Sequence, residues 1–279
     1  MLAADMQKGT SKTIVIGSEN FPEEVLLANL YGHALQDAGF NVVLRTNLGA
    51  RQVVIPALAH ASLDLVPEYA GALALYLDPA IGTKANSLST VIPVLRRLLA
   101  KHGATVLQAA PAVDTNVFAV TQSTKRKYHL TTLSSLKPYA SRLTLGGPPE
   151  CPQNATCELG LERVYGLHFK AFVSTDEAGP ISVAALKSGR AQVAEFFSSN
   201  GAIQDNHFYE LRDNRHMQAA DDVIPVIRKA VNSARIASTL NALSKKLSTD
   251  ALARMNTAVA KHESPASVAA RWLASEGLG

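Results

Sequence analysis

The stretch Thr13-Ile-Val-Ile-Gly17, followed at once by Ser18-Glu-Asn-Phe-Pro22, decides the fold class of this chain. Its first part is a short apolar run of β-branched residues, which is typical of a buried strand. The second part is typical of a helix start, because Asn20 suits the N-cap and Pro22 suits the first turn. Apolar residues then recur at helical spacing until Gly39, where we expect the helix to end. The sequence therefore predicts a strand that leads directly into a helix, the repeating unit of an α/β sheet.

The same alternation of strand and helix patterns continues along the chain in two series. We expect further elements of the first series at residues 41–45, 51–60, 63–66, 89–102 and 104–107, with a proline turn at 67–71. We expect the second series at 117–121, 133–139, 143–145, 158–165, 171–174, 181–188 and 191–197. An apolar stretch over 221–228 precedes three helices at 233–243, 249–262 and 265–275. This order predicts two mostly parallel, doubly wound α/β lobes, as the length of 279 residues also favours.

The composition favours a globular protein with a hydrophobic core. Hydrophobic residues make up 47% of the chain and charged residues 18%, which excludes an intrinsically disordered protein. The net charge of +4 is scattered, and no aromatic residue interrupts its densest cluster, Lys125-Arg126-Lys127. We interpret that cluster as a solvated helix end, and we expect no nucleic-acid partner. No apolar run approaches the ~20 residues that a membrane span needs.

Two cysteines, Cys151 and Cys157, enclose five residues of a loop that contains Pro and Asn. A short, turn-rich separation closes readily into a disulfide, and disulfides persist in oxidising compartments. A zinc or redox pair is the alternative, but no histidine lies nearby and the spacing is not Cys-x-x-Cys. The N-terminal segment lacks the apolar core of a signal peptide. We therefore expect a mature form that works in the periplasm or at the outer face of the cell membrane.

Signatures of catalysis are missing from the sequence. The first strand-to-helix turn lacks Gly-x-Gly-x-x-Gly, and the P-loop, His-Glu-x-x-His and Gly-x-Ser-x-Gly motifs do not occur. The eight histidines show no spacing typical of metal ligands. We therefore predict that the protein is not an enzyme, and we expect neither a cofactor nor a metal ion.

Two strand ends are candidates for ligand binding. The turn from Ser18 to Phe21 opens a helix, whose free N–H groups can hold a polar or anionic group, although such a turn can also simply cap its own helix. Glu68 and Tyr69 follow the next strand of the predicted sheet. Tyrosine combines a π face with a polar tip and suits a cation, although the ring can equally pack beneath a loop.

Seven segments of the chain, taken in order, resemble the osmoprotectant (glycine betaine/carnitine/choline) binding proteins of ABC importers. They span most of the sequence, and they are 13–24, 47–51 with 56–58, 63–71, 184–189, 197–201, 211–213 and 222–228. The resemblance implies a type II periplasmic-binding-protein fold, in which two α/β lobes are joined by two hinge strands and close on the ligand. It places one lobe at residues 1–113 and 223–279 and the other at residues 114–222. It also implies a monomer that delivers its solute to an ABC permease with its ATPase and is tethered to the membrane only through a lipid anchor.

Members of this family hold a quaternary ammonium group in a cage of tyrosines and clamp a carboxylate with an arginine. The resemblance assigns Tyr69 to the cage, but Asn116, Phe197 and Asp221 stand where further tyrosines are usual. The cysteine loop near Asn154 contains no arginine for the clamp. The candidate ligand-binding residues are Ser18, Glu19, Asn20, Phe21, Glu68, Tyr69, Asp114, Thr115, Asn116, Asn154, Phe197, Ser198, Ser199 and Asp221.

These departures from the family pattern leave the ligand open. Asp114 or Asp221 can replace aromatic faces by direct charge, which favours a cation without a carboxylate, such as choline. A cleft lined by Asn116, Phe197 and Ser198 suits an uncharged polar or aromatic solute equally. A ligand-sensing domain with the same clamp fold is the alternative class, and it predicts an attached DNA-binding or signalling segment.

Overall fold

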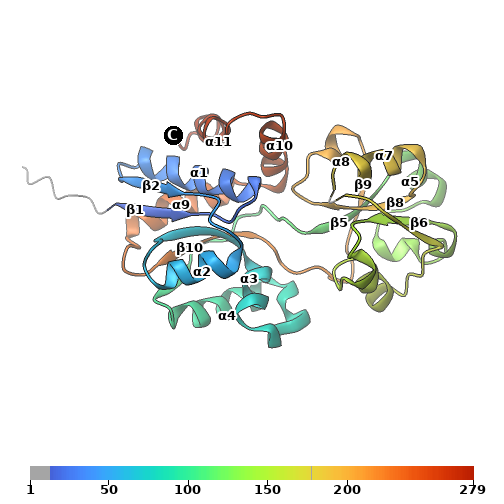
Figure 1. The fold of residues 1–279 in the computed structure, drawn as a ribbon, viewed down its shortest axis with the longest axis horizontal. Coiled ribbons are helices and arrows are strands. Elements are labelled where there is room, and N and C mark those ends of the chain that lie inside the picture. Colours follow the sequence, from blue (N-terminus) through green and yellow to red (C-terminus); the bar gives the residue numbers. More distant parts are fainter. Residues whose placement is uncertain (1–12, 177) are drawn as a thin grey trace, which may run out of the picture.

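A computed structural model describes residues 13–176 and 178–279 of the chain. Two lobes lie side by side and are joined by extended segments (Figure 1), and each lobe contains one five-stranded sheet. None of the helices in these ranges is long and apolar enough to cross a membrane.

The sheet of the first lobe combines strands from both ends of the chain. Its order is β2-β1-β3-β10-β4, and its strands are β1 (Ile14–Gly17), β2 (Val42–Arg45), β3 (Leu65–Tyr69), β4 (Ala104–Val106) and β10 (Val223–Arg228). Strand β1 runs parallel to β2 and β3, whereas β10 pairs antiparallel with β3 and β4. The reversed strand is the one that arrives from the other lobe.

Helices cover both faces of this sheet and form two separate hydrophobic cores. One face carries α1 (Pro22–Asp37), α9 (Ala234–Lys246), α10 (Thr249–Ala260) and α11 (Pro265–Ser275). The other carries α2 (Arg51–Ala59), α3 (Ala70–Leu77), the 3₁₀ segment η1 (Pro79–Asn86) and α4 (Leu88–Ala100). The C-terminal helices therefore pack on the first helix of the chain, where Leu240, Leu252 and Leu273 are buried with Leu27 and Leu30.

The sheet of the second lobe repeats this plan. Its order is β7-β6-β8-β5-β9, and its strands are β5 (Asn116–Val120), β6 (Thr144–Gly147), β7 (Ala171–Ser174), β8 (Val193–Phe197) and β9 (Tyr209–Leu211). Strand β5, which arrives from the first lobe, is again the reversed one. The helical segments are α5 (Gln122–Tyr128), η2 (Leu133–Leu136), η3 (Ala140–Arg142), η4 (Cys151–Gln153), α6 (Glu158–Gly160), η5 (Leu161–Tyr165), α7 (Pro180–Ser188) and α8 (Ala202–Asp205).

Two crossing segments, residues 107–115 and 212–222, join the lobes. They pair with each other through an antiparallel bridge between Val113 and Asp222. The second segment also passes so close to α3 that a Cβ on Gly71 would lie 2.7 Å from the Cβ of Ala219. Only glycine permits this approach, so the sequence around Gly71 fixes how the crossing segment leaves the first lobe.

The two-lobed α/β fold expected from the sequence is confirmed, with four strands of each sheet running in one direction. The lobe limits at residues 113/114 and 222/223 remain a prediction. The proline turn at residues 67–71 was wrong, because Pro67 continues β3 and stands opposite Pro225 of β10. Asn20 is not the N-cap of α1 either, since Phe21 occupies that position without a side-chain cap. The helix expected at 133–139 is only the 3₁₀ turn η2.

Candidate functional site

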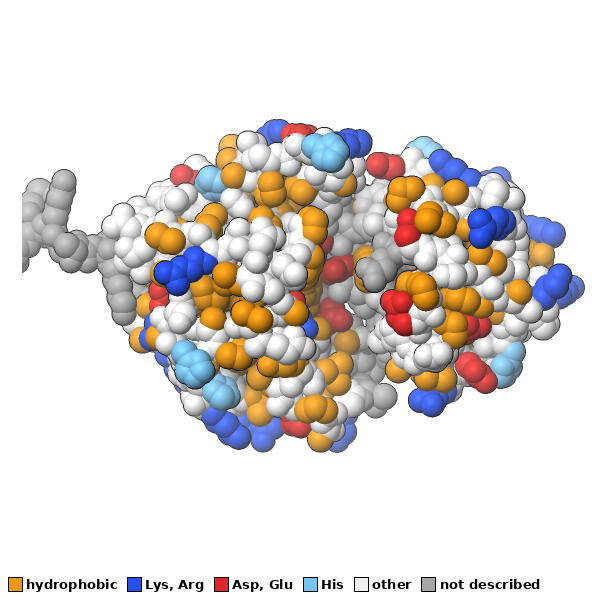
Figure 2. Space-filling model, in the orientation of Figure 1, with side chains coloured by type: hydrophobic (Ala, Val, Ile, Leu, Met, Phe, Trp, Pro, Cys, Tyr) orange, Lys and Arg blue, Asp and Glu red, His pale blue; other side chains and the backbone are white. Residues whose placement is uncertain are grey.

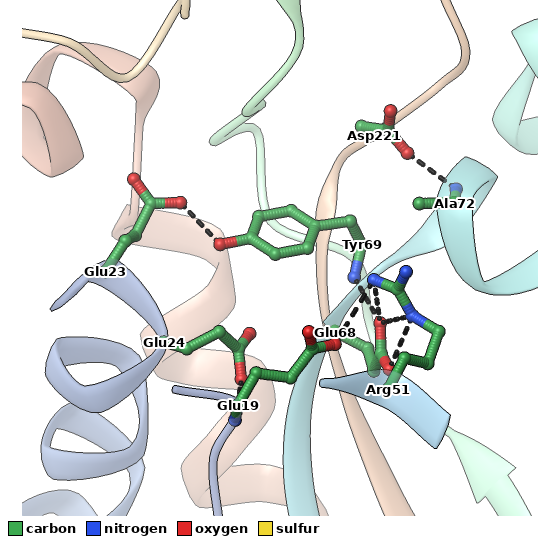
Figure 3. Close-up of polar contacts among 8 residues, drawn as sticks. All are labelled: Glu19, Glu23, Glu24, Arg51, Glu68, Tyr69, Ala72 and Asp221. Carbon is green, nitrogen blue, oxygen red and sulfur yellow. Dashed lines mark hydrogen bonds and ion pairs between the residues drawn. The ribbon is translucent and has the colours of Figure 1, made fainter. Parts of the chain in front are cut away.

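A groove runs between the two lobes, and acidic side chains lie on its wall (Figure 2). Five parts of the chain reach this region: the β1–α1 turn, the end of β3, the two crossing segments and the loop after β8. Figure 3 shows how residues of the β1–α1 turn, the end of β3 and the second crossing segment approach one another. Below, "acidic wall" means Glu19, Glu23, Glu24 and Glu68 of the first lobe, together with Arg51 and Tyr69.

The β1–α1 turn is held by the buried hydroxyl of Ser18. This group accepts a hydrogen bond from the backbone N–H of Asn47 at 3.2 Å and donates to the carbonyl of Glu19 at 2.9 Å. Glu19 is thereby aimed into the acidic wall, whereas the side chain of Asn20 is exposed. Ser18 consequently stabilises the turn itself.

Arg51 at the start of α2 is the cation of the acidic wall. Its Nε lies 2.9 Å from both carboxylate oxygens of Glu68, and its Nη2 lies 2.9 Å from Glu68 Oε2 and 3.4 Å from Glu19 Oε1. Burial raises the pKa of Glu68 to about 7, while the adjacent guanidinium lowers it. Burial likewise raises the pKa of Glu19 against the opposing effect of Arg51. Arg51 is therefore already engaged by two carboxylates and offers little to an anionic ligand.

Glu24 is the most deeply buried acid of this wall. Its Oε2 accepts a hydrogen bond from the backbone N–H of Glu19 at 3.2 Å, and its Oε1 is buried without a hydrogen-bond partner. Burial, with the nearby Glu68 carboxylate as the next cause, raises the pKa of Glu24 well above its ordinary value. Burial therefore disfavours the charged form of Glu24.

Tyr69 connects the acidic wall to the C-terminal helices. Its hydroxyl donates to Glu23 Oε1 at 2.6 Å, and the other oxygen of Glu23 accepts from the amide of Asn256 in α10. Phe21 stacks near the Tyr69 ring, with centroids 6.3 Å apart and an angle of 22°. Burial, and then the charge of Asp114, raise the pKa of Glu23 to about 7. The rings of Phe21 and Tyr69 therefore lie beside the carboxyl group of Glu23, whose pKa is near neutrality.

The crossing segments add two further acids beside this wall. Asp114 accepts a hydrogen bond from the Ser199 hydroxyl at 2.7 Å. Asp221 accepts from the backbone N–H of Ala72 at 2.7 Å, in the first turn of α3, where a helix end favours negative charge. Burial raises the pKa of Asp114, and it raises the pKa of Asp221 to about 6.

The second lobe presents a neutral wall, by which we mean Asn116, Asn154, Phe197, Ser198 and Ser199. Asn116 donates to Glu195 and, at 3.3 Å, to the hydroxyl of Thr156, which itself donates to Asn154 at 2.8 Å. Phe197 stands opposite Asn116 in the sheet. The hydroxyl of Ser198 binds the first crossing segment, where it donates to Val113 O at 2.8 Å. Thr115 and Asn116 also line a pocket of about 200 Å³, which Asn86 of the first lobe borders.

The expected disulfide between Cys151 and Cys157 is present, and both residues are fully buried in the core of the second lobe. With Glu195 they form the only group in the described ranges whose spacing would suit a metal ion. Because the two sulfur atoms are bonded to each other, neither is available as a thiolate ligand.

Most of the candidate residues therefore converge on the groove. Glu19, Phe21, Glu68 and Tyr69 meet on the acidic wall, and Asp114, Ser199 and Asp221 lie beside it. Four residues of this region, Glu23, Glu24, Arg51 and Asn256, were not among the site residues expected from the sequence. Glu23 and Glu24 were adjacent to the chosen turn, and Arg51 closed one of the seven segments, so a signal for these three existed.

Comparisons with known proteins identify the family of this chain. Residues 12–275 match the family model for the substrate binding domain of ABC-type glycine betaine transport systems. The chain is 25% identical to the glycine betaine-binding protein YehZ of Escherichia coli (99% of this chain, 95% of YehZ) and 25% identical to the carnitine transport binding protein OpuCC of Listeria monocytogenes (95% and 87%).

Solved structures show the same fold. A glycine betaine/carnitine/choline ABC transporter structure superposes with a TM-score of 0.84 at 21% identity, covering 95% of this chain and 99% of the other. Apo YehZ from Escherichia coli gives 0.84 at 22%, covering 96% and 100%. Members of this family are extracytoplasmic proteins that bind small solutes and work with a permease and an ATPase. The chain belongs to the family of substrate-binding domains of ABC-type glycine betaine transport systems, and its role is to bind a solute.

Proposed function

We propose that this protein captures a small quaternary ammonium solute without a carboxylate, of the choline type, in the groove between its lobes. Its relatives YehZ and OpuCC are named for glycine betaine and carnitine, which carry the same ammonium group together with a carboxylate. The ammonium group is therefore the shared element, and the carboxylate is where this chain differs.

One observation carries the proposal: the groove collects acids and aromatic rings around an arginine that is already paired. Tyr69 and Phe21 supply π faces for a cation. Asp114 and Asp221 supply charge beside them, whereas Nε and Nη2 of Arg51 are already paired with Glu68 and Glu19. A ligand carboxylate in this place would meet like charges, and such juxtaposition disfavours binding.

The test is a thermal-shift and calorimetric comparison of choline, glycine betaine, carnitine and 3,3-dimethylbutan-1-ol, the uncharged analogue of choline. Binding to the folded state raises the melting temperature by mass action. We expect the largest rise with choline, smaller rises with the two carboxylates and none with the uncharged alcohol. Equal responses to choline and the alcohol would favour an uncharged or aromatic solute and would overturn the proposal.

The variant Tyr69→Ala probes the site directly. Loss of one aromatic face should weaken choline binding by at least about fivefold, since a desolvated cation–π contact contributes roughly 1–2 kcal/mol. Unchanged affinity would remove Tyr69 from the site.

The working context belongs to the same proposal. The protein acts in the periplasm or at the outer face of the membrane as a monomer, is tethered there only if it carries a lipid anchor, and delivers its solute chemically unchanged to an ABC permease. Size-exclusion chromatography with light scattering tests the monomer. Recovery of intact choline from the denatured complex tests the absence of turnover.

A further inference from the structure

Helix α10 of the first lobe contacts the second lobe. This contact is separate from the two crossing segments, which connect the lobes covalently. Figure 1 shows α10 at the edge of its lobe, facing α8. Four residues of α10 meet the segment Ser199–Gln204, which contains the loop after β8 and the start of α8, and they are Asp250, Ala253, Asn256 and Thr257. Their spacing of three and four residues places them along one side of the helix.

Gly201 allows the closest approach in this contact. A Cβ at this position would lie 1.7 Å from Oγ1 of Thr257, 3.1 Å from its Cβ and 3.2 Å from the carbonyl oxygen of Ala253. The backbone of Gly201 has a φ of −62°, which any residue adopts, so the glycine is required by space and not by conformation. The loop and the helix are thus in direct contact across the gap between the lobes.

Asn256 lies at the centre of this contact. Its amide nitrogen donates to the Glu23 carboxylate of the first lobe and, at 3.1 Å, to the carbonyl of Ser199 in the second lobe. An asparagine amide has two hydrogens, so one side chain can make both bonds. On one side Glu23 accepts from Tyr69, and on the other Ser199 donates to Asp114. A continuous series of hydrogen bonds therefore links the ring of Tyr69 to the second lobe.

The N-terminal end of α10 is attached to the hinge. The hydroxyl of Thr249 accepts a hydrogen bond from the backbone N–H of Val113, in the first crossing segment, at 3.0 Å. At the next residue of the helix, Asp250 accepts a hydrogen bond from the side-chain amide of Gln204 in the second lobe at 3.1 Å. The helix thus extends from the hinge to the outer loop, and opening of the lobes has to separate its Asn256 from Ser199.

We propose that Asn256 is a positioning residue that holds the lobes together through the contact between α10 and the segment Ser199–Gln204. We call this contact the latch. Removing the contact shifts the protein toward an open arrangement even without solute. A lower population of the closed arrangement reduces the apparent affinity for any solute that needs it. The effect on affinity rests on the proposed function, whereas the effect on lobe separation does not.

The experiment measures the distance between the lobes in the solute-free protein. Spin labels on Arg97→Cys in α4 and Lys187→Cys in α7, both exposed positions, report the separation by pulsed electron paramagnetic resonance. The native cysteines are bonded to each other and do not react with the label. The variants are Asn256→Leu, which keeps the number and branching of the heavy atoms but has no donor, and Gly201→Ala, which inserts a methyl group into the contact. Thr257→Ala and the double variant Gly201→Ala/Thr257→Ala are the matched controls.

We expect Asn256→Leu and Gly201→Ala to move the distance distribution to longer values, Thr257→Ala to leave it unchanged, and the double variant to return toward the wild type. Choline titration of the same proteins should show three- to tenfold weaker binding for the first two variants, as the loss of one or two hydrogen bonds implies. Distances equal to those of the wild type in both Asn256→Leu and Gly201→Ala would overturn the latch. A wild type that binds no choline, with the distance changes as expected, would overturn the proposed solute and leave the latch supported.

Discussion

The acidic wall of the first lobe and the neutral wall of the second face the same groove but are built in different ways. Glu19 and Glu68 of the acidic wall are paired with Arg51, so the shape of this wall depends on charge pairing. The neutral wall uses asparagine, serine and phenylalanine, and the Cys151–Cys157 bond constrains the loop that carries Asn154. The contrast indicates that the first lobe supplies charge to a solute and the second supplies hydrogen bonds and shape.

Replacing Arg51 should cause the largest loss of stability. The size of this loss measures how far the acidic wall depends on Arg51. We expect Arg51→Met to lower the free energy of unfolding by about 3 kcal/mol, because breaking a buried pair leaves carboxylates without a counter-charge. Urea denaturation at pH 8 measures this loss, and the additional change Glu68→Gln should recover part of it.

The control is Arg271→Met, which breaks an exposed pair with Glu263. Exposed pairs contribute little, so we expect a loss below about 1 kcal/mol. If Arg51→Met cost no more than Arg271→Met, the acidic wall would not depend on charge pairing.

The second prediction tests the covalent constraint on the neutral wall. The double variant Cys151→Ala/Cys157→Ala should lose about 2 kcal/mol of unfolding free energy, as the closure of a short loop implies. Treatment of the wild type with a reductant in urea should reproduce the loss, and the double variant should not respond to it. A loss within the ~0.5 kcal/mol typical of surface substitutions would contradict a structural role.

The third prediction uses the raised pKa of Glu23, which is about 7 because of burial and the nearby Asp114. Glu23 keeps its proton below that pH, and a cation favours the ionised form, so choline affinity should rise between pH 6 and pH 8. Release of one proton per bound cation gives up to about tenfold per pH unit. Calorimetric titrations across this range measure the slope.

The same raised pKa predicts an opposite trend for the solute-free protein. The stabilising contribution of protonated Glu23 is complete below the ordinary glutamate pKa and is lost as pH rises through about 7. Glu23→Gln should flatten both profiles. A choline affinity that is independent of pH in the wild type would separate Glu23 from the site.

We expect the smallest effect from a substitution that makes the neutral wall more like the tyrosine cages of the family. Phe197→Tyr places a tyrosine where the family usually has one, so we expect choline binding to improve. The improvement should be only about two- to threefold, because one aromatic face is exchanged for a similar one. Phe172→Tyr in β7, an edge strand of the same sheet, is the matched control. Improved binding in the control alone would show that Phe197 does not face the solute.

The sequence allowed the two-lobed fold to be predicted because local patterns determine it: helix α11 begins and ends at the predicted residues, and β7 does as well. Local patterns failed where distant pairing decides. Pro67 signals a turn by itself, but β10 pairs along the whole of β3 and keeps the chain extended. The β1–α1 turn and Tyr69 were found because each stands at a strand end. Asn256 could not be found, because its partner Glu23 lies 233 residues away in the chain.

A crystal structure of the protein with saturating choline would show where the ammonium group binds. We expect this group in the groove, in contact with the Tyr69 ring and within reach of the carboxylates of Asp114 and Asp221, with Arg51 still bound to Glu68. Choline bound outside the groove, or an ammonium group held by the neutral wall away from all three of these side chains, would contradict this expectation.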